Sequence, residues 1–124
     1  MPILDVEVVL APGETVPAET AAALAGAAAA VFRSPEGSTW VRLHELPDER
    51  YAENGCGAGF RPVFVLVRKA QLPAEIDLER EASELAAAVA SVFGRPVENV
   101  HIIYEPPIAG RIAFGGKLFR KQQC

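Results

Sequence analysis

The chain has 124 residues, half of them hydrophobic, which is the usual size of one domain with a buried core and excludes wholesale disorder. Twelve basic and 16 acidic residues give a net charge of -4, so the basic surface of a nucleic-acid-binding protein is not expected. No apolar run approaches the ~20 residues of a membrane span, and no basic and apolar leader is visible, so we expect a cytoplasmic protein without a membrane partner. Cys56 and Cys124 are too few for a disulfide framework or a metal cluster.

The first half of the chain predicts a strand, a helix and a second strand. Apolar and acidic residues alternate over Ile3–Leu10, which is typical of a half-buried strand that ends at Pro12-Gly13. A helix is expected from about Pro17 to Arg33, because proline suits a first helical turn and apolar residues then recur at helical spacing. A short strand is expected at Thr39–Leu46, followed by a polar, glycine-rich loop over Asp48–Gly59.

The second half repeats this order. Val63–Arg68 predicts a strand that is apolar on both faces. A helix is expected from about Leu78 to Phe93, with Asp77 as its N-cap. Val100–Tyr104 predicts the fourth strand, and Arg111–Phe119 a final short β segment around a pair of glycines.

Three weak sequence matches at nearly one spacing indicate an internal repeat. Val31-Phe32-x-x-Pro35 recurs 61 residues later, while Pro2 and Glu45-x-Pro47 both recur 60 residues later, as Pro62 and Glu105-x-Pro107. We therefore expect a single domain over 1–124 that is built from two units, at about 1–60 and 61–124.

The predicted fold class is α+β with the order β-α-β-β-α-β, in which a four-stranded sheet carries two helices on one face and has a pseudo-twofold repeat. Two helices leave the other sheet face uncovered, although Phe64 and Leu66 of the third strand point toward it. Because a monomer rarely exposes a large apolar patch, we expect another copy of the chain to cover this face.

Pro2 is the sharpest chemical feature of the sequence. Removal of Met1 would leave Pro2 with a free secondary amine, and an α-amino group titrates near ~8 in water. Burial in an apolar pocket or a nearby cation lowers that pKa, and a neutral amine near pH 7 is a competent general base. The nitrogen of Pro62 is locked in a peptide bond and is not basic, so one chain should contribute one active site.

The chain resembles the tautomerase superfamily through its Met1-Pro2 start, its two units and two later segments. Asn99–Glu105 followed by Phe114-Gly115-Gly116 resembles the second strand and C-terminal turn of the oxalocrotonate tautomerases, and His44–Asp48 resembles the macrophage migration inhibitory factors. The malonate semialdehyde decarboxylases are similar through the second half. The resemblance implies a homotrimer with inward-facing sheets and proton transfer on a small carboxylate or keto-acid substrate, without a metal or cofactor.

The resemblance also implies site residues. Pro2 matches the catalytic base. The positions that match substrate-binding or pocket-lining residues are Arg33, Arg42, Tyr51, His101, Ile103, Tyr104 and Ile112. An alignment anchored on Glu45 puts Trp40 in place of Arg42.

Several family residues are replaced in this chain, and these departures leave the named reaction open. The arginine that follows the first strand of the short members gives way to Ala11-Pro12-Gly13, and the two arginines of the decarboxylases give way to Lys69, Gln71 and Pro73.

The sequence is compatible with three functions. The first is a keto–enol tautomerase with Pro2 as base. The second is a dehalogenase, hydratase or decarboxylase of the same superfamily, with protonated Pro2 as acid. The third is a non-catalytic oligomeric binding module, since ferredoxin-like regulatory domains share this element order on antiparallel sheets.

Overall fold

The computed structural model describes residues 2–55 and 60–120, so predictions that concern Met1, Cys56 and Cys124 lie outside the described residues. Its elements follow the predicted order: β1 (Ile3–Leu10), α1 (Thr20–Phe32), β2 (Trp40–Pro47), η1 (Asp48–Arg50), β3 (Val63–Arg68), α2 (Glu75–Phe93), η2 (Val97–Asn99), β4 (Val100–Tyr104), β5 (Ala113–Phe114) and β6 (Lys117–Leu118). Within the described ranges, no helix is long and apolar enough to cross a bilayer.

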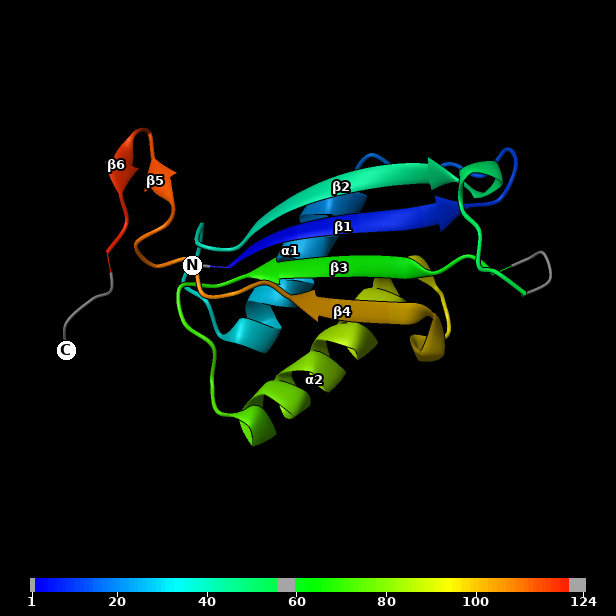
Figure 1. Ribbon diagram of the computed structural model, residues 1–124. Coiled ribbons are helices and arrows are strands. Elements are labelled where there is room, and N and C mark those ends of the chain that lie inside the picture. The colour runs from blue at the N-terminus through cyan, green and yellow to red at the C-terminus, as the bar shows by residue number, and fades with distance from the viewer. Residues whose placement is uncertain (1, 56–59, 121–124) are drawn as a thin grey trace.

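One four-stranded mixed sheet organises the fold, in the order β2-β1-β3-β4 (Figure 1). The two outer pairs, β1–β2 and β3–β4, are parallel, and the central pair β1–β3 is antiparallel. Each parallel pair is joined through one helix, so the molecule is two β-α-β units set side by side in opposite directions. The α+β prediction is confirmed, and the antiparallel ferredoxin-like arrangement is excluded.

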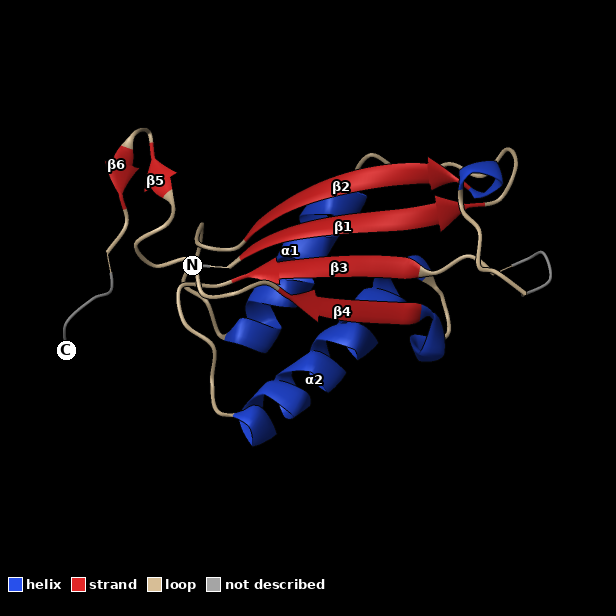
Figure 2. Cartoon of the chain, viewed as in Figure 1, coloured by secondary structure: helices blue, strands red, loops and turns tan. Residues whose placement is uncertain are grey.

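Both helices lie on the same face of the sheet (Figure 2). Alternate residues of the central strands point into this layer and are at most 1% exposed: Leu4, Val6 and Val8 of β1, and Val63, Val65 and Val67 of β3. They pack against Leu24 and Ala28 of α1 and against Leu85 and Val89 of α2. The core therefore lies between the sheet and the helices, and the other sheet face has no layer of its own.

The predicted starts of both helices are wrong. Thr20 donates its backbone N–H to the carbonyl of Pro17 at 3.1 Å, so residues 17–20 form a turn, and α1 begins at Thr20. The second helix begins at Glu75, with Ala74 rather than Asp77 as N-cap. Asp77 lies in the first turn of α2, where its carboxylate interacts favourably with the unpaired N–H groups of the helix end.

The repeat is present in the elements, but two of the three sequence matches are out of register with the sheet. A spacing of 60 pairs Ile3, on the uncovered face, with Val63 in the core. Because strand side chains alternate between faces, only an odd spacing keeps a residue on its face. A spacing of 61 pairs Leu4 with Val65, both in the core, and agrees with the match between the helix ends. Pro62 is therefore not the structural counterpart of Pro2.

A short C-terminal hairpin of β5 and β6 lies beside the start of β1 (Figure 1). Its turn uses Gly115 and Gly116 at φ 58° and 85°, a conformation that suits glycine. Phe114 packs edge-on against Trp40, the first residue of β2, with ring centroids 5.5 Å apart. The hairpin is thus attached to the end of the sheet at which Pro2 lies.

Candidate active site

Pro2 is buried at the beginning of the central strand β1. Its carbonyl accepts a hydrogen bond from the backbone N–H of Trp40 at 3.0 Å. On the other side, Ile3 pairs with Arg68, the last residue of β3, so continuation of this register sets Lys69 beside Pro2. The first described residue is therefore held between two strands, as a rigidly placed reactive group requires.

A polar cluster lies on the helix-covered side of the sheet at this same end. Glu81 of α2 accepts a hydrogen bond from the hydroxyl of Tyr104 at 3.0 Å, and its other carboxylate oxygen lies 2.9 Å from Nζ of Lys69. The Lys69 ammonium also lies 4.9 Å from the ring centroid of Phe32, a cation–π contact. We call Lys69, Glu81 and Tyr104 the Glu81 cluster.

Partial burial governs the ionisation of Tyr104. Burial raises the pKa of the Tyr104 phenol, and the negative charge and hydrogen bond of Glu81 raise it further. The hydroxyl therefore stays protonated at neutral pH and acts as a donor to Glu81. The predicted pocket residue Tyr104 thus points toward α2 within this chain.

Arg33 directly follows α1, in a left-handed backbone conformation with φ 54°. It is the one non-glycine residue of the described chain with a positive φ. A cleft of about 420 Å³ between the end of α1 and the start of α2 is lined by residues of both, Arg33 and Glu81 among them. The structure thus brings Arg33 and the Glu81 cluster to one end of the helix layer.

Arg42 lies on the uncovered face of the sheet, where Asp5 binds it. Nε and Nη2 of Arg42 donate to the two carboxylate oxygens of Asp5 at 2.6 and 2.8 Å, and Arg68 also donates to Asp5. His44 Nε2 lies 4.0 Å from the same carboxylate. The hydrogen bond from Arg42 lowers the pKa of Asp5 most, against the effect of burial, and Arg68 lowers it further. Within one chain the charge of Arg42 is therefore balanced by Asp5.

Tyr51 and His101 flank the ring of Phe64 on the uncovered face, with centroid distances of 5.9 and 5.5 Å. Phe64 pairs with Glu7, which is five residues along β1 from Pro2, or about 17 Å at ~3.3 Å per residue. Ile103 lies on the same face of β4 and is 46% exposed. These three predicted site residues do not meet Pro2 within a single chain.

Ile112 precedes the C-terminal hairpin, and its carbonyl accepts the backbone N–H of Phe119 at 2.8 Å. The turn before it is closed by Arg111, whose guanidinium donates to the carbonyls of Pro106 and Pro107 at 2.7 to 3.0 Å. Ile112 therefore belongs to the segment that attaches the hairpin near Trp40.

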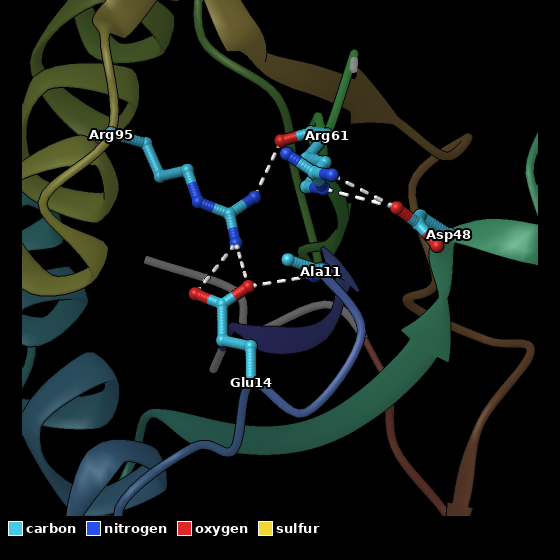
Figure 3. A network of polar contacts seen from close by, with 5 residues as sticks. All are labelled: Ala11, Glu14, Asp48, Arg61 and Arg95. Atoms are coloured by element: carbon cyan, nitrogen blue, oxygen red, sulfur yellow. Dashed lines mark hydrogen bonds and ion pairs between the residues drawn. The ribbon is translucent and has the colours of Figure 1, made fainter. Parts of the chain in front are cut away.

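The opposite end of the sheet, next to Pro62, holds a different network (Figure 3). Arg95 donates to the carbonyl of Arg61 and lies 3.3 and 3.4 Å from the carboxylate oxygens of Glu14. Glu14 also accepts the backbone N–H of Ala11 at 2.8 Å, and Arg61 binds Asp48 at 3.1 and 3.2 Å. Two clefts of about 450 and 590 Å³ lie at this end. Both arginines are already paired with carboxylates, so neither is a free cation for an acidic substrate.

Sequence reasoning did not identify Lys69 or Glu81 as site residues. Lys69 stood out only as a departure from the decarboxylase pattern, and its place beside Pro2 follows from the β1–β3 register. Glu81 carries no sequence signal, because its partners lie 12 and 23 residues away on other elements. Within residues 2–55 and 60–120, no three His, Cys, Asp or Glu side chains are grouped to hold a metal ion.

Solved structures similar to this chain include Pt0534, MIF and fused 4-OT proteins. Pt0534, in its crystal structure inactivated by 2-oxo-3-pentynoate, matches with a TM-score of 0.74 and 18% identity over 94% of both chains. MIF2 of Leishmania major matches with a TM-score of 0.73 and 20% identity, over 96% of this chain and 97% of the other. A fused 4-OT, F6, described as an asymmetric trimer, matches with a TM-score of 0.72 and 19% identity, over 92% and 94%.

The chain therefore has the fold of the tautomerase superfamily, as its resemblance predicted. Neither a protein-family model nor a curated protein sequence matches it. At 18 to 20% identity, the likeness establishes the fold, and the chemistry must be argued from the site.

Proposed function

We propose that this protein is a cofactor-independent keto–enol tautomerase that acts on a small α-keto or enol acid, with the amine of Pro2 as general base. The observation that carries the proposal is the placement of Pro2, which is buried immediately before the central strand β1, between the start of β2 and the end of β3. A secondary amine so held has a fixed direction and little access to water, which are the two conditions that general-base catalysis needs.

The reaction is a proton transfer with no net change in composition. The neutral Pro2 amine removes the enol hydroxyl proton, and the electron pair of that O–H bond forms the π bond of the carbonyl. The π pair of the enol C=C bond then forms a C–H bond with the proton of the Pro2 ammonium, which returns the amine to its neutral form. A cation is needed to hold the substrate carboxylate. Arg33 is the candidate, because it ends α1 at the Pro2 end of the helix layer and has no carboxylate partner among the ion pairs of the described chain.

The similar structures support this chemistry. Pt0534 is inactivated by 2-oxo-3-pentynoate, which is itself a 2-keto acid with an electrophilic alkyne. The native fused 4-OT is similar over nearly the whole of both chains, 92% of this chain and 94% of the other. The same class of substrate therefore suits the proposed base here.

The assembly that we propose is a homotrimer. Tyr51, His101 and Ile103 lie too far from Pro2 to line its pocket within one chain, so they could do so only from a neighbouring copy. Three of the similar structures are described as fused 4-OT trimers, two asymmetric and one symmetric.

The test is ketonisation of phenylenolpyruvate and of 2-hydroxymuconate by the native protein and by Pro2→Ala, after mass spectrometry shows whether Met1 is absent. We expect Pro2→Ala to lower kcat/KM by at least about 100-fold, the usual contribution of a general base. Pro12→Ala, a change at an exposed proline in the turn after β1, serves as the matched control and should leave the rate unchanged.

Two further measurements complete the test. Incubation with 2-oxo-3-pentynoate should add one inhibitor molecule per chain, recovered on the N-terminal peptide. Activity that depends on neutral Pro2 should rise with pH through the pKa of the amine, whereas a fall would assign the acid role of the dehalogenases and decarboxylases. Equal rates for native protein and Pro2→Ala would remove Pro2 from the mechanism.

A further inference from the structure

We infer that Lys69, held in place by Glu81, is the cation that keeps the amine of Pro2 uncharged near neutral pH. The inference rests on the proposed function, in which Pro2 is the base. It assigns Lys69 an electrostatic role and Glu81 a positioning role.

The first support is the position of Lys69 in the sheet. Ile3 pairs with Arg68 across the antiparallel β1–β3 pair, so Pro2 and Lys69 occupy adjacent positions with Cα atoms about 5 Å apart. Side chains alternate along a strand, and the neighbours Leu4 and Val67 both point into the helix-covered layer. Pro2 and Lys69, each two residues further along, therefore lie on that same side.

The second support is the way in which the Lys69 ammonium is held. Lys69 is 19% exposed and Glu81 15% exposed, so this is a partly buried ion pair with little screening by solvent. Phe32 of α1 lies on one side of the ammonium, and Glu81 of α2 binds it on the other. Tyr104 donates to the second oxygen of Glu81 and fixes the direction of the carboxylate.

The third support is the distribution of charge around Pro2. On the uncovered side, Arg68 of β3 is neutralised by Asp5 of β1 and Glu105 after β4. On the helix-covered side, Lys69 and Glu81 form an ion pair, and Arg33 at the end of α1 shares a cleft with Asp77, Arg80, Glu81 and Glu84 of α2. The titratable and charged groups at this end of the described chain are Asp5, Arg33, Arg42, Arg68, Lys69, Asp77, Arg80, Glu81, Glu84, Tyr104 and Glu105.

A cation beside Pro2 disfavours a second positive charge on the amine, and the Glu81 carboxylate partly cancels that effect. Loss of the cation and loss of the anion must therefore shift the titration of Pro2 in opposite directions. If the ion pair had only a structural role, the two substitutions would break the same contact and would not shift the pKa of Pro2 in opposite directions.

The experiment is a ¹⁵N-NMR titration of the Pro2 amine in proline-labelled protein, which needs no turnover. We expect Lys69→Met to raise the pKa of Pro2 by about one unit and Glu81→Gln to lower it. Lys69→Arg should restore the native value. Arg50→Met is the matched control, since Arg50 is exposed in η1 after β2, at the opposite end of the sheet, and its loss should cause no shift.

Shifts in the same direction, or no shift in either variant, would overturn the inference. Circular dichroism of each variant checks that it is folded, and the Lys69→Arg titration keeps the test decisive if Lys69→Met fails to fold. The kinetic test of Pro2→Ala distinguishes the two proposals. If Pro2→Ala loses activity while the titrations do not move, the role of Lys69 fails and the proposed function stands.

Discussion

Arg33 and Gly94 end the two helices in the same left-handed conformation, with φ 54° and 67°, at equivalent places of the two units. Glycine adopts this conformation freely, whereas an L side chain pays roughly 1–2 kcal/mol for it. Strain at a non-glycine residue persists where the side chain serves another purpose. The strain at Arg33 thus agrees with its proposed role in binding the substrate carboxylate.

We predict that Arg33→Gly stabilises the protein by about 1 kcal/mol and raises KM for the keto acid by about tenfold or more. Urea denaturation and steady-state kinetics measure the two effects. Gly94→Ala is the control, since an added Cβ there meets nothing within 4 Å, and it should destabilise by about 1 kcal/mol with KM unchanged. An unchanged KM in Arg33→Gly would exclude Arg33 from binding.

At the scale of elements, α2 has a clearer amphipathic pattern than α1. It packs against β4 and α1, and its buried residues are Leu85, Ala86, Val89 and Ala90, which recur at helical spacing. The helix α1 is dominated by alanine and buries Leu24 as its one large side chain below 9% exposure. The helix α2, which carries Glu81, is therefore held in place mainly by its own buried apolar residues.

We predict that Leu85→Ala destabilises the protein by about 3 kcal/mol, the usual cost of a cavity at a fully buried leucine. Ile76→Ala on the same helix is the control, because Ile76 is 79% exposed and its loss should cost less than about 0.5 kcal/mol. Denaturant midpoints of the two variants provide the comparison, and equal losses would contradict the packing described for α2.

At the scale of the whole molecule, the sheet face opposite the helices is the surface available for association. It is less apolar than the sequence suggested, because Asp5, Arg42, His44 and Arg68 lie on it beside Phe64 and Leu66. The ion pairs are formed within the chain, so a second copy could cover them without leaving an isolated charge. This face therefore suits contact with the same mixture of charged and apolar side chains on a second copy of the chain.

We predict a native mass three times the 13.2 kDa of the chain in sedimentation experiments at micromolar concentration. Ile103→Lys places a charge on this face and should reduce the mass toward that of a single chain, with loss of tautomerase activity. Ile76→Lys, on an exposed site of α2, is the control and should leave both properties unchanged. A fully active native monomer would contradict the proposed assembly.

The strands were predictable because their signal is local. Local apolar patterns, alternating in β1 and continuous in β3, placed three of the four sheet strands at their observed ends, and β2 is displaced by one residue. The first residues of the two helices were not predictable in this way, since they depend on the conformation of the turns that follow Pro17 and Pro73. For the site, sequence reasoning could point to Pro2, because its chemistry is that of one residue.

The sequence by itself determined the number, type and order of the elements and the candidate base, since each depends on neighbouring residues or on one functional group. Only the tertiary structure decided which residues accompany that base. The antiparallel β1–β3 register sets Lys69 beside Pro2, and helix packing brings Glu81 to Lys69 and Tyr104. The same register sends Tyr51 and His101 to the far end of the sheet, because strand direction and pairing, which no local pattern encodes, determine which distant side chains meet.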